Sequence, residues 1–346
     1  MTFAQVRGQD APVASLQRAL RDGRVHHAYR FEGPSGVGKE LVAFALAQAL
    51  VCTGDPAALG CGACSGCRRA VTFSEESPCV PLHPDVVLVE RGLYDGILKD
   101  DSGRKIEERK DISIHQIRKV VLEKAPFAPF EARARIFIFR AAEEMNPSAA
   151  NALLKTLEEP RPGTHFVLLT SAPDRLLPTI RSRTLPVRFG PLASNVMRSL
   201  LEERGVAAER LDEAVELGAG SVEAALAHTN DTEAERRRAF VTGLLEAALT
   251  RSAGAAARFA ESSDLDRLGA RDELLAVAAH LARIARVAAV RDPAAANALA
   301  QGYEATVAAV RDFEQANAAP TLALGRLVLA LGRTGAARAA TRFAEA

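Results

Sequence analysis

The chain has 346 residues, enough for two or three domains of ordinary size. Lys and Arg together number 44 and Asp and Glu 43, so the formal net charge is +1, whereas a protein that coats nucleic acid needs a larger basic surplus. Apolar residues make up 48% and charged residues 25%, which is typical of a folded globular protein and excludes disorder as the main theme. The sequence contains no long apolar run, and its first ten residues carry charges at Arg7 and Asp10, where a signal peptide needs an apolar core. It therefore predicts a cytoplasmic protein with no membrane partner.

Short apolar runs alternate with helical patterns along the first 190 residues. Five of the runs have the character of strands, at residues 28–31, 86–89, 136–139, 166–170 and 185–189. Four segments between them have the spacing of helices, at residues 41–50, 112–125, 149–158 and 179–183. Strands that are apolar on both faces and alternate with helices predict a parallel sheet that is covered by helices.

The character of the sequence changes after Gly190, where Ala dominates and helical periodicity takes over. We therefore predict an α/β domain over residues 1–190, a small helical domain over 191–230 and a larger helical domain over 231–346. The larger domain contains one clear apolar stripe, made of Leu274, Val277, Leu281, Ile284 and Ala288 and stopped by Pro293. Within the first domain, 11 of the 20 residues from 91 to 110 are charged, which predicts a solvated loop or hairpin.

A glycine-rich stretch between the first strand and the next helix fits the phosphate-binding pattern G-x-x-x-x-G-K. It includes Gly33, Gly36, Gly38 and Lys39, and such loops surround phosphates with backbone N–H groups at a helix N-terminus. The next residue is Glu40, where an active ATPase has the Ser or Thr that ligates magnesium. The loop therefore predicts a nucleotide-type fold with a degenerate site, and the sequence leaves open whether nucleotide still binds.

The third predicted strand ends where a phosphate-loop ATPase carries its two catalytic acids. The residues at these positions are Arg140 and Ala141, and neither holds magnesium or polarises water. Glu143 and Glu144 come too late in the sequence, and we expect them to be solvated charges. Because positions 40 and 140 serve the same magnesium in this fold, we predict an ion pair between Glu40 and Arg140; the alternative is that both side chains point to solvent.

The five cysteines lie between residues 52 and 79. Four of them follow the pattern C-x8-C-x2-C-x2-C: Cys52, Cys61, Cys64 and Cys67. Tight C-x2-C loops present thiolates to one tetrahedral ion, and zinc is the usual choice. Four protein ligands leave no open position, so we predict a structural zinc site; an iron–sulfur cluster and free thiols are the weaker alternatives. We interpret Cys79 as a spare thiol and His83 as a structural residue.

Several motifs occur in a fixed order along the chain. They are VRGQD at 6–10, HAY at 27–29, the phosphate loop, NALLKTLEEP at 151–160 and SR at 182–183. Together they resemble the AAA+ subunits of the bacterial DNA polymerase III clamp loader, and residues 172–183 resemble the delta-prime family most closely. Asn317 with residues 322–324 is similar to the collar helix of these subunits. The resemblance implies an α/β AAA+ module, a helical lid over 191–230 and an all-α collar that joins a ring of five subunits.

The same resemblance assigns a role to Ser182, Arg183 and Thr184, which match the Ser-Arg-Cys motif of the family with a change at the third residue. It implies that Arg183 reaches into the ATP site of a neighbouring subunit as an arginine finger. A guanidinium suits that role because it neutralises the charge on a transferring phosphoryl group through a rigid fork of donors. The alternative is a surface arginine in a salt bridge.

Two further positions follow from the resemblance. Active clamp-loader ATPases carry an arginine after a Gly-Ser pair in the lid, and Glu223 stands at that place after Gly220 and Ser221. Thr170 or Ser171 occupies the polar sensor position at the end of the fourth strand. A polar residue at the sensor position does not by itself restore hydrolysis.

These features lead to a hypothesis for the function. The resemblance implies a non-hydrolysing subunit that acts as a stator, joins tau/gamma and delta subunits in the ring, and helps load the sliding clamp onto primed DNA. One alternative is an ATP-hydrolysing motor subunit of the tau/gamma type, and a less favoured one is a zinc-dependent nucleic-acid-binding module.

Overall fold

The computed structural model describes residues 1–99, 103, 105, 111–229, 231–263, 267–315 and 319–343. The chain folds into two compact units, residues 1–204 with 219–224, and residues 205–218 with 225–346. Much of the predicted 91–110 loop and Asn317 lie outside the described residues, although an antiparallel bridge joins Lys99 to Lys105. Within the described ranges, none of the helices has both the length and the apolar character that a membrane span requires.

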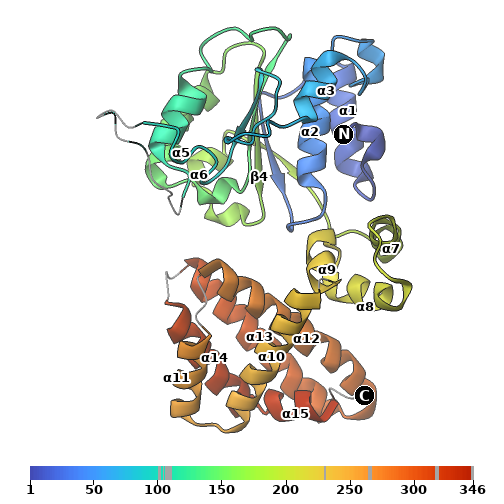
Figure 1. Ribbon diagram of the computed structural model, residues 1–346, viewed down its shortest axis with the longest axis vertical. Coiled ribbons are helices and arrows are strands. Elements are labelled where there is room, and N and C mark those ends of the chain that lie inside the picture. Colours follow the sequence, from blue (N-terminus) through green and yellow to red (C-terminus); the bar gives the residue numbers. More distant parts are fainter. Residues whose placement is uncertain are drawn as a thin grey trace. The chain divides into compact units, whose positions relative to one another are not determined.

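A five-stranded parallel sheet forms the centre of the first unit (Figure 1). Its strands are β1 (Ala28–Glu32), β2 (Val86–Val89), β3 (Arg135–Phe139), β4 (Thr164–Thr170) and β5 (Leu185–Arg188), and their spatial order is β2-β3-β4-β1-β5. In register, Phe31 of β1 lies between Leu169 of β4 and Val187 of β5. All five predicted strands are confirmed. Because β3, β4 and β1 are parallel neighbours, their C-terminal ends lie next to one another.

Helices cover both faces of this sheet (Figure 1). The helices of the first unit are η1 (Phe3–Gln5), α1 (Asp10–Arg21), α2 (Lys39–Val51), η2 (Pro56–Ala58), α3 (Ser65–Val71), α4 (Ile114–Gln116), η3 (Ile117–Leu122), η4 (Ala142–Glu144), α5 (Pro147–Glu158), η5 (Pro173–Arg175), α6 (Pro178–Arg181) and α7 (Ser194–Glu203). On one face, Phe31 and Ile138 pack with residues of α1 and α2. On the other, Phe137 and Phe166 stack at 5.2 Å between ring centroids and pack with η3 and α5. Burial on both faces explains why each strand is a continuous apolar run.

Helix α2 is apolar around most of its circumference and is buried along most of its length. It begins at the phosphate loop and ends at Val51, with Cys52 as the C-cap residue. The helix predicted over 112–125 forms as α4 followed directly by η3, whose six residues have π-helical hydrogen bonding. Both helices therefore form where the pattern predicts them.

The second unit is helical throughout its described residues. It contains α8 (Ala208–Gly218), most of α9 (Val222–Thr229), α10 (Asp231–Leu249), α11 (Ala253–Ser262), α12 (Arg267–Arg291), α13 (Pro293–Gln315), α14 (Pro320–Thr334) and α15 (Ala336–Phe343). The predicted apolar stripe lies in α12, and all five of its residues are fully buried in the core of this unit. Pro293 opens α13, which fits the preference of proline for the first turn of a helix.

Candidate functional site: a degenerate phosphate loop, an arginine corner and a cysteine cluster

The phosphate loop connects β1 to α2, and its glycines are required by close packing. Gly33 has φ +149°, and a Cβ atom there would clash with the backbone carbonyl of Phe189. Gly36 has φ +70°, and a Cβ atom there would overlap Ser221 and Glu223. The structure thus places Glu223 directly against the phosphate loop, where the Val222 N–H also donates to the Gly36 carbonyl at 3.1 Å.

Lys39 is turned back onto its own loop. Its Nζ donates to the carbonyl oxygens of Gly33 and Pro34, both at 2.5 Å, and the residue is only 8% exposed. Burial lowers the pKa of Lys39 to about 8, against the opposing effect of the carboxylates of Glu143 and Glu223. The ammonium group is therefore held by protein oxygens and balanced by protein carboxylates.

The predicted pair between Glu40 and Arg140 is confirmed, because an Arg140 Nη2 donates to Glu40 Oε1. A second acid completes the network, since Arg140 Nη1 donates to Glu90 Oε2 at 2.6 Å. Burial alone would lower the pKa of Arg140, but the two carboxylates hold it above its ordinary value. Val89 and Phe139 are paired in the sheet, so the residues that follow them, Glu90 and Arg140, emerge side by side. A guanidinium thus lies where a magnesium-binding ATPase carries a carboxylate.

The expectation that Glu143 and Glu144 are solvated is wrong. Glu143 Oε1 accepts from the backbone N–H of Ser171 at 3.0 Å and from its hydroxyl at 2.9 Å, while Glu143 Oε2 is buried without a hydrogen-bond partner. Glu144 lies 3.5 Å from Arg91, and burial raises the pKa of its carboxyl. The short helix η4 folds this acidic turn back against the end of β4, which a linear pattern does not reveal.

Of the two polar candidates at the end of β4, Ser171 is the one that contacts an acid of the site. Thr170 is 1% exposed, and its hydroxyl accepts from the backbone N–H of Ala172 at 3.1 Å. Ala141 follows Arg140 with φ +46° and offers only a methyl group. Each cation of the site is thus balanced by carboxylates: Glu143 and Glu223 act on Lys39, and Glu40 and Glu90 bind Arg140.

Arg183 lies at a separate corner of the same unit, just after α6. Its side chain is 33% exposed, and its Nε donates to Glu158 Oε1 at 2.7 Å. Its Nη1 donates to the carbonyl oxygen of Thr179 at 3.0 Å and to the hydroxyl of Ser182 at 3.2 Å. The guanidinium is thus ordered and still reachable from solvent.

A buried arginine anchors the backbone of this corner. Arg30, in β1, is 6% exposed, and its Nη1 donates to Thr184 Oγ1 at 2.7 Å and to the Arg181 carbonyl at 2.9 Å. The Thr184 hydroxyl in turn donates to the Ile180 carbonyl at 2.9 Å. The residue that departs from Ser-Arg-Cys therefore has a structural role. Sequence reasoning missed Arg30, although one charge inside an apolar strand was a visible signal.

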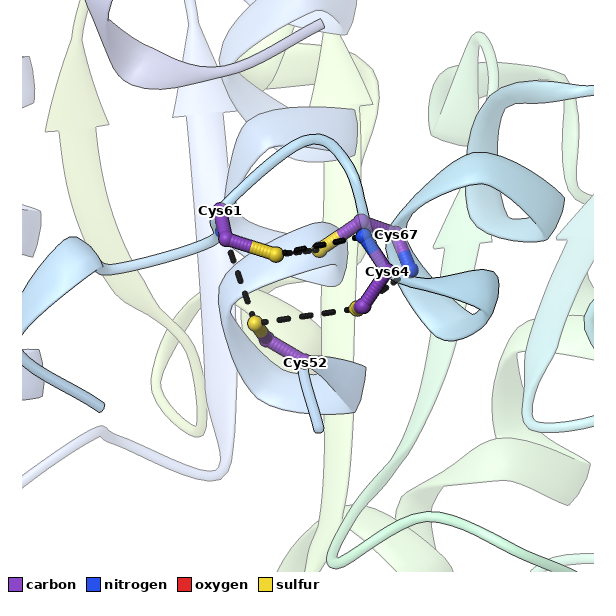
Figure 2. A group of neighbouring side chains, drawn as sticks. All are labelled: Cys52, Cys61, Cys64 and Cys67. Carbon is purple, nitrogen blue, oxygen red and sulfur yellow. Dashed lines mark hydrogen bonds between the residues drawn. The ribbon is translucent and has the colours of Figure 1, made fainter. Parts of the chain in front are cut away.

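The four cysteines predicted to share a metal ion come together (Figure 2). Their Sγ atoms all lie within 4.8 Å of one another, with Cys52 to Cys64 at 3.9 Å and Cys61 to Cys67 at 4.0 Å. Edges near these lengths suit a tetrahedron of sulfurs around an ion with Zn–S bonds of about 2.3 Å. Cys52 caps α2, Cys61 lies in the loop before α3, and Cys64 and Cys67 lie at the start of α3. The cluster therefore ties these two helices together.

Backbone amides prepare the sulfurs for a cation. The N–H of Cys64 donates to Cys61 Sγ at 3.3 Å, and the N–H of Cys67 donates to Cys64 Sγ at 3.4 Å. Burial would raise the pKa of the Cys64 thiol, but hydrogen bonds from Cys67 and Thr53 bring it down to about 5. The N–H of Cys64 likewise lowers the pKa of Cys61, whereas burial raises that of Cys67. Thiolates bind metal, so this donor set fits a zinc ion.

The two remaining predictions near the cluster concern single residues. Cys79 is exposed and does not belong to the group of four. His83 is 2% exposed, and its Nδ1 accepts from the backbone N–H of Asp85 at 3.1 Å. The structural role predicted for His83 is confirmed.

A comparison with known families matches the part of the chain that contains the phosphate loop and all five strands. A family model described as "DNA polymerase III, delta subunit" matches residues 8–193, which is more than half of the chain. The chain belongs to this family. Together with the phosphate loop and the order of the sheet, membership confirms the AAA+ type of the α/β module.

Curated relatives agree with membership of this DNA polymerase III family. The chain is 34% identical over 200 residues to a delta-prime subunit of Pseudomonas aeruginosa and 32% identical over 222 residues to that of Bacillus subtilis, covering 56% and 64% of this chain. It is also 36% identical over 209 residues, or 59% of this chain, to the gamma/tau subunit of Mycobacterium tuberculosis. The resemblance to delta-prime is therefore confirmed.

These matches span only part of the relatives. They cover 32% of the gamma/tau subunit and 53% and 60% of the two delta-prime subunits. Among solved structures, a gamma subunit-related protein of Thermotoga maritima aligns over 92% of this chain and 98% of its own, with 16% identity and a TM-score of 0.40.

Proposed function

We propose that this protein is a non-hydrolysing subunit of the DNA polymerase III clamp loader. It acts as a stator within a ring that also contains tau/gamma and delta subunits, and the complete complex loads the sliding clamp onto primed DNA. The observation that carries the proposal is the network of Arg140 with Glu40 and Glu90, which stands in place of the magnesium ligands. Family membership supports the role in the clamp loader.

The loss of hydrolysis follows from the chemistry of the phosphate loop. ATP is normally bound with magnesium, which neutralises the charge that develops on the phosphates. Here a fixed guanidinium replaces the metal, and it is already balanced by two acids. Lys39 is likewise bonded within its own loop. Among the described residues, positions 40, 140 and 141 therefore provide neither the magnesium ligands nor the acid that would orient the attacking water.

The arginine corner supports the second half of the proposal. We assign Arg183, with Ser182 beside it, to the ATP site of the neighbouring subunit, where the guanidinium stabilises the transferring phosphoryl group. The partial exposure of Arg183 is what such a role requires. In the same scheme, residues 191–230 serve as the lid and residues 231–346 as the collar that holds the ring.

The direct test is hydrolysis of ATP by the purified chain. We expect no turnover above background with magnesium present, while a purified tau/gamma subunit assayed in parallel does hydrolyse ATP. Turnover by the isolated chain that disappears in Lys39→Ala would instead establish the motor function, which the intact glycines and the gamma/tau relatives favour as the second candidate.

We also propose that the four clustered cysteines hold one structural zinc ion. The support is the donor set itself, four sulfurs within 4.8 Å that receive N–H bonds. Elemental analysis of freshly purified protein is expected to give about one equivalent of zinc, in line with a single four-thiolate site. Less than half an equivalent of any metal would contradict the assignment, and iron in place of zinc would identify a cluster.

A further inference from the structure

We infer that Glu158 is a positioning residue for Arg183. Its carboxylate binds Nε and Nη2 of the guanidinium. Nη1 is left as the nitrogen that donates a hydrogen bond to a phosphate oxygen of the ATP in the neighbouring subunit. The inference rests on the proposed function, in which Arg183 acts in trans.

The contacts of the guanidinium divide into a charged edge and a neutral edge. On the charged edge, Nε donates to Glu158 Oε1 at 2.7 Å, and Nη2 contacts the same oxygen. On the neutral edge, Nη1 donates to the Thr179 carbonyl at 3.0 Å and the Ser182 hydroxyl at 3.2 Å. Hydrogen bonds between charged partners are shorter and stronger than those to neutral acceptors. An arriving phosphate therefore replaces the neutral acceptors of Nη1 and leaves the bonds to Glu158 in place.

The location of Glu158 gives a second, independent reason. It is the last residue of α5, where the carbonyl end of the helix dipole disfavours a negative side chain. Residues that break a local preference are expected where function requires them and where another contact compensates. The ion pair with Arg183 is that compensation, because it places a cation beside the carboxylate at the helix end.

The backbone around Arg183 is already fixed, so positioning its side chain fixes the guanidinium. Arg30 fixes the backbone on both sides of Arg183 through the Arg181 carbonyl and the Thr184 hydroxyl, so the remaining freedom lies in the side chain. A free arginine side chain has many rotamers and loses that freedom when it binds. Holding one edge of the guanidinium in advance lowers this cost for the step in trans.

The test compares four versions of this subunit in the reconstituted clamp-loader complex: Glu158→Ala, Arg183→Ala, the double variant, and Glu159→Ala as the matched control. Glu159 follows Glu158 at the same helix end and is also exposed. We expect Glu158→Ala to lower kcat for DNA-stimulated ATP hydrolysis roughly threefold to tenfold with little change in KM, because positioning affects the transition state. The double variant is expected to match Arg183→Ala, since residues that act as one unit are not additive.

Each outcome decides the matter. The inference would be overturned by additive losses in the double variant, by an equal loss in Glu159→Ala, or by an unchanged or higher kcat in Glu158→Ala. In each of these cases, a lower kcat in Arg183→Ala would still support the arginine finger. No effect of Arg183→Ala would overturn the finger and this inference with it. Glu158→Gln retains one acceptor, so an intermediate kcat is expected from it, and thermal melting of each isolated variant confirms that the fold is kept.

Discussion

The phosphate loop and the arginine corner belong to the same folded unit, yet their charges are arranged in opposite ways. At the loop, Arg140 is bound by two carboxylates, and Lys39 is buried against its own backbone. At the corner, Arg183 meets one carboxylate and stays partly exposed. The difference fits the proposed function, in which the phosphate loop no longer hydrolyses ATP and Arg183 acts at the ATP site of a neighbouring subunit.

Removing the proposed zinc ion from the cysteine cluster is expected to produce the largest effect, and only in the part of the unit that contains the phosphate loop and α2. A structural zinc contributes on the order of 10 kcal/mol to the folding of a small metal module. Because Cys52 caps α2, chelation at neutral pH should increase hydrogen exchange at the end of α2 and in α3, with residues 178–184 unaffected. An equal increase of hydrogen exchange in α2 and in residues 178–184 would show that the metal site stabilises both regions of the unit.

Arg183→Ala is the corresponding test of the corner. An arginine finger contributes about 10³-fold or more to hydrolysis at the site it serves, although a bulk rate from a complex with several ATP sites shows less. We expect the isolated variant to fold normally. We also expect clamp loading by the assembled complex to slow, which is measured as ATP turnover on primed DNA. Arg181→Ala, which removes an exposed arginine paired with Asp174, is the matched control. Unchanged clamp loading would contradict the comparison.

The buried lysine predicts a pH dependence of stability. The pKa of Lys39 falls from 10.5 to about 8 on folding, which corresponds to a penalty on the order of 3 kcal/mol for burying the charged form. The penalty is fully present below pH 8. Between pH 8 and 10.5 the unfolded state binds more protons, so this group makes the free energy of unfolding rise with pH.

Urea denaturation from pH 7 to pH 10 measures that contribution. The stability of Lys39→Met relative to the wild type should fall across this range, because only the wild type gains from losing the proton. Lys155→Met, at an exposed position of α5, should show no such trend. A parallel pH profile for wild type and Lys39→Met would mean that the ammonium is not buried in solution.

The smallest effect is expected from Glu40→Thr, which restores the hydroxyl of an active phosphate loop. Glu40 is 43% exposed in its side chain, so losing its ion pair should cost no more than about 1 kcal/mol in the free energy of unfolding. Hydrolysis should remain absent, because Arg140 and Ala141 still replace the acids. ATP turnover by this single variant would show that the Arg140 network is not what silences the site.

The sheet could be predicted from the sequence because strands buried on both faces leave continuous apolar runs, as in β3. The same pattern does not give the order of the strands, so Glu90 was missed as the second partner of Arg140. The pair of Glu40 with Arg140 was predictable because both positions serve one metal ion in active relatives of the fold. Glu143 was predicted wrongly, since its hydrogen bonds to Ser171 depend on how η4 turns back onto β4.

The cysteine content has a practical consequence for following this protein in a complex. The chain contains five cysteines, and Cys79 is the exposed one outside the cluster of four. If the proposed zinc ion holds the other four thiols, a maleimide dye reacts at Cys79 alone, without any engineered substitution. Thr184 in place of the usual cysteine keeps a further thiol away from the arginine corner. Fluorescence from Cys79 can therefore report on the assembly of the unmodified sequence.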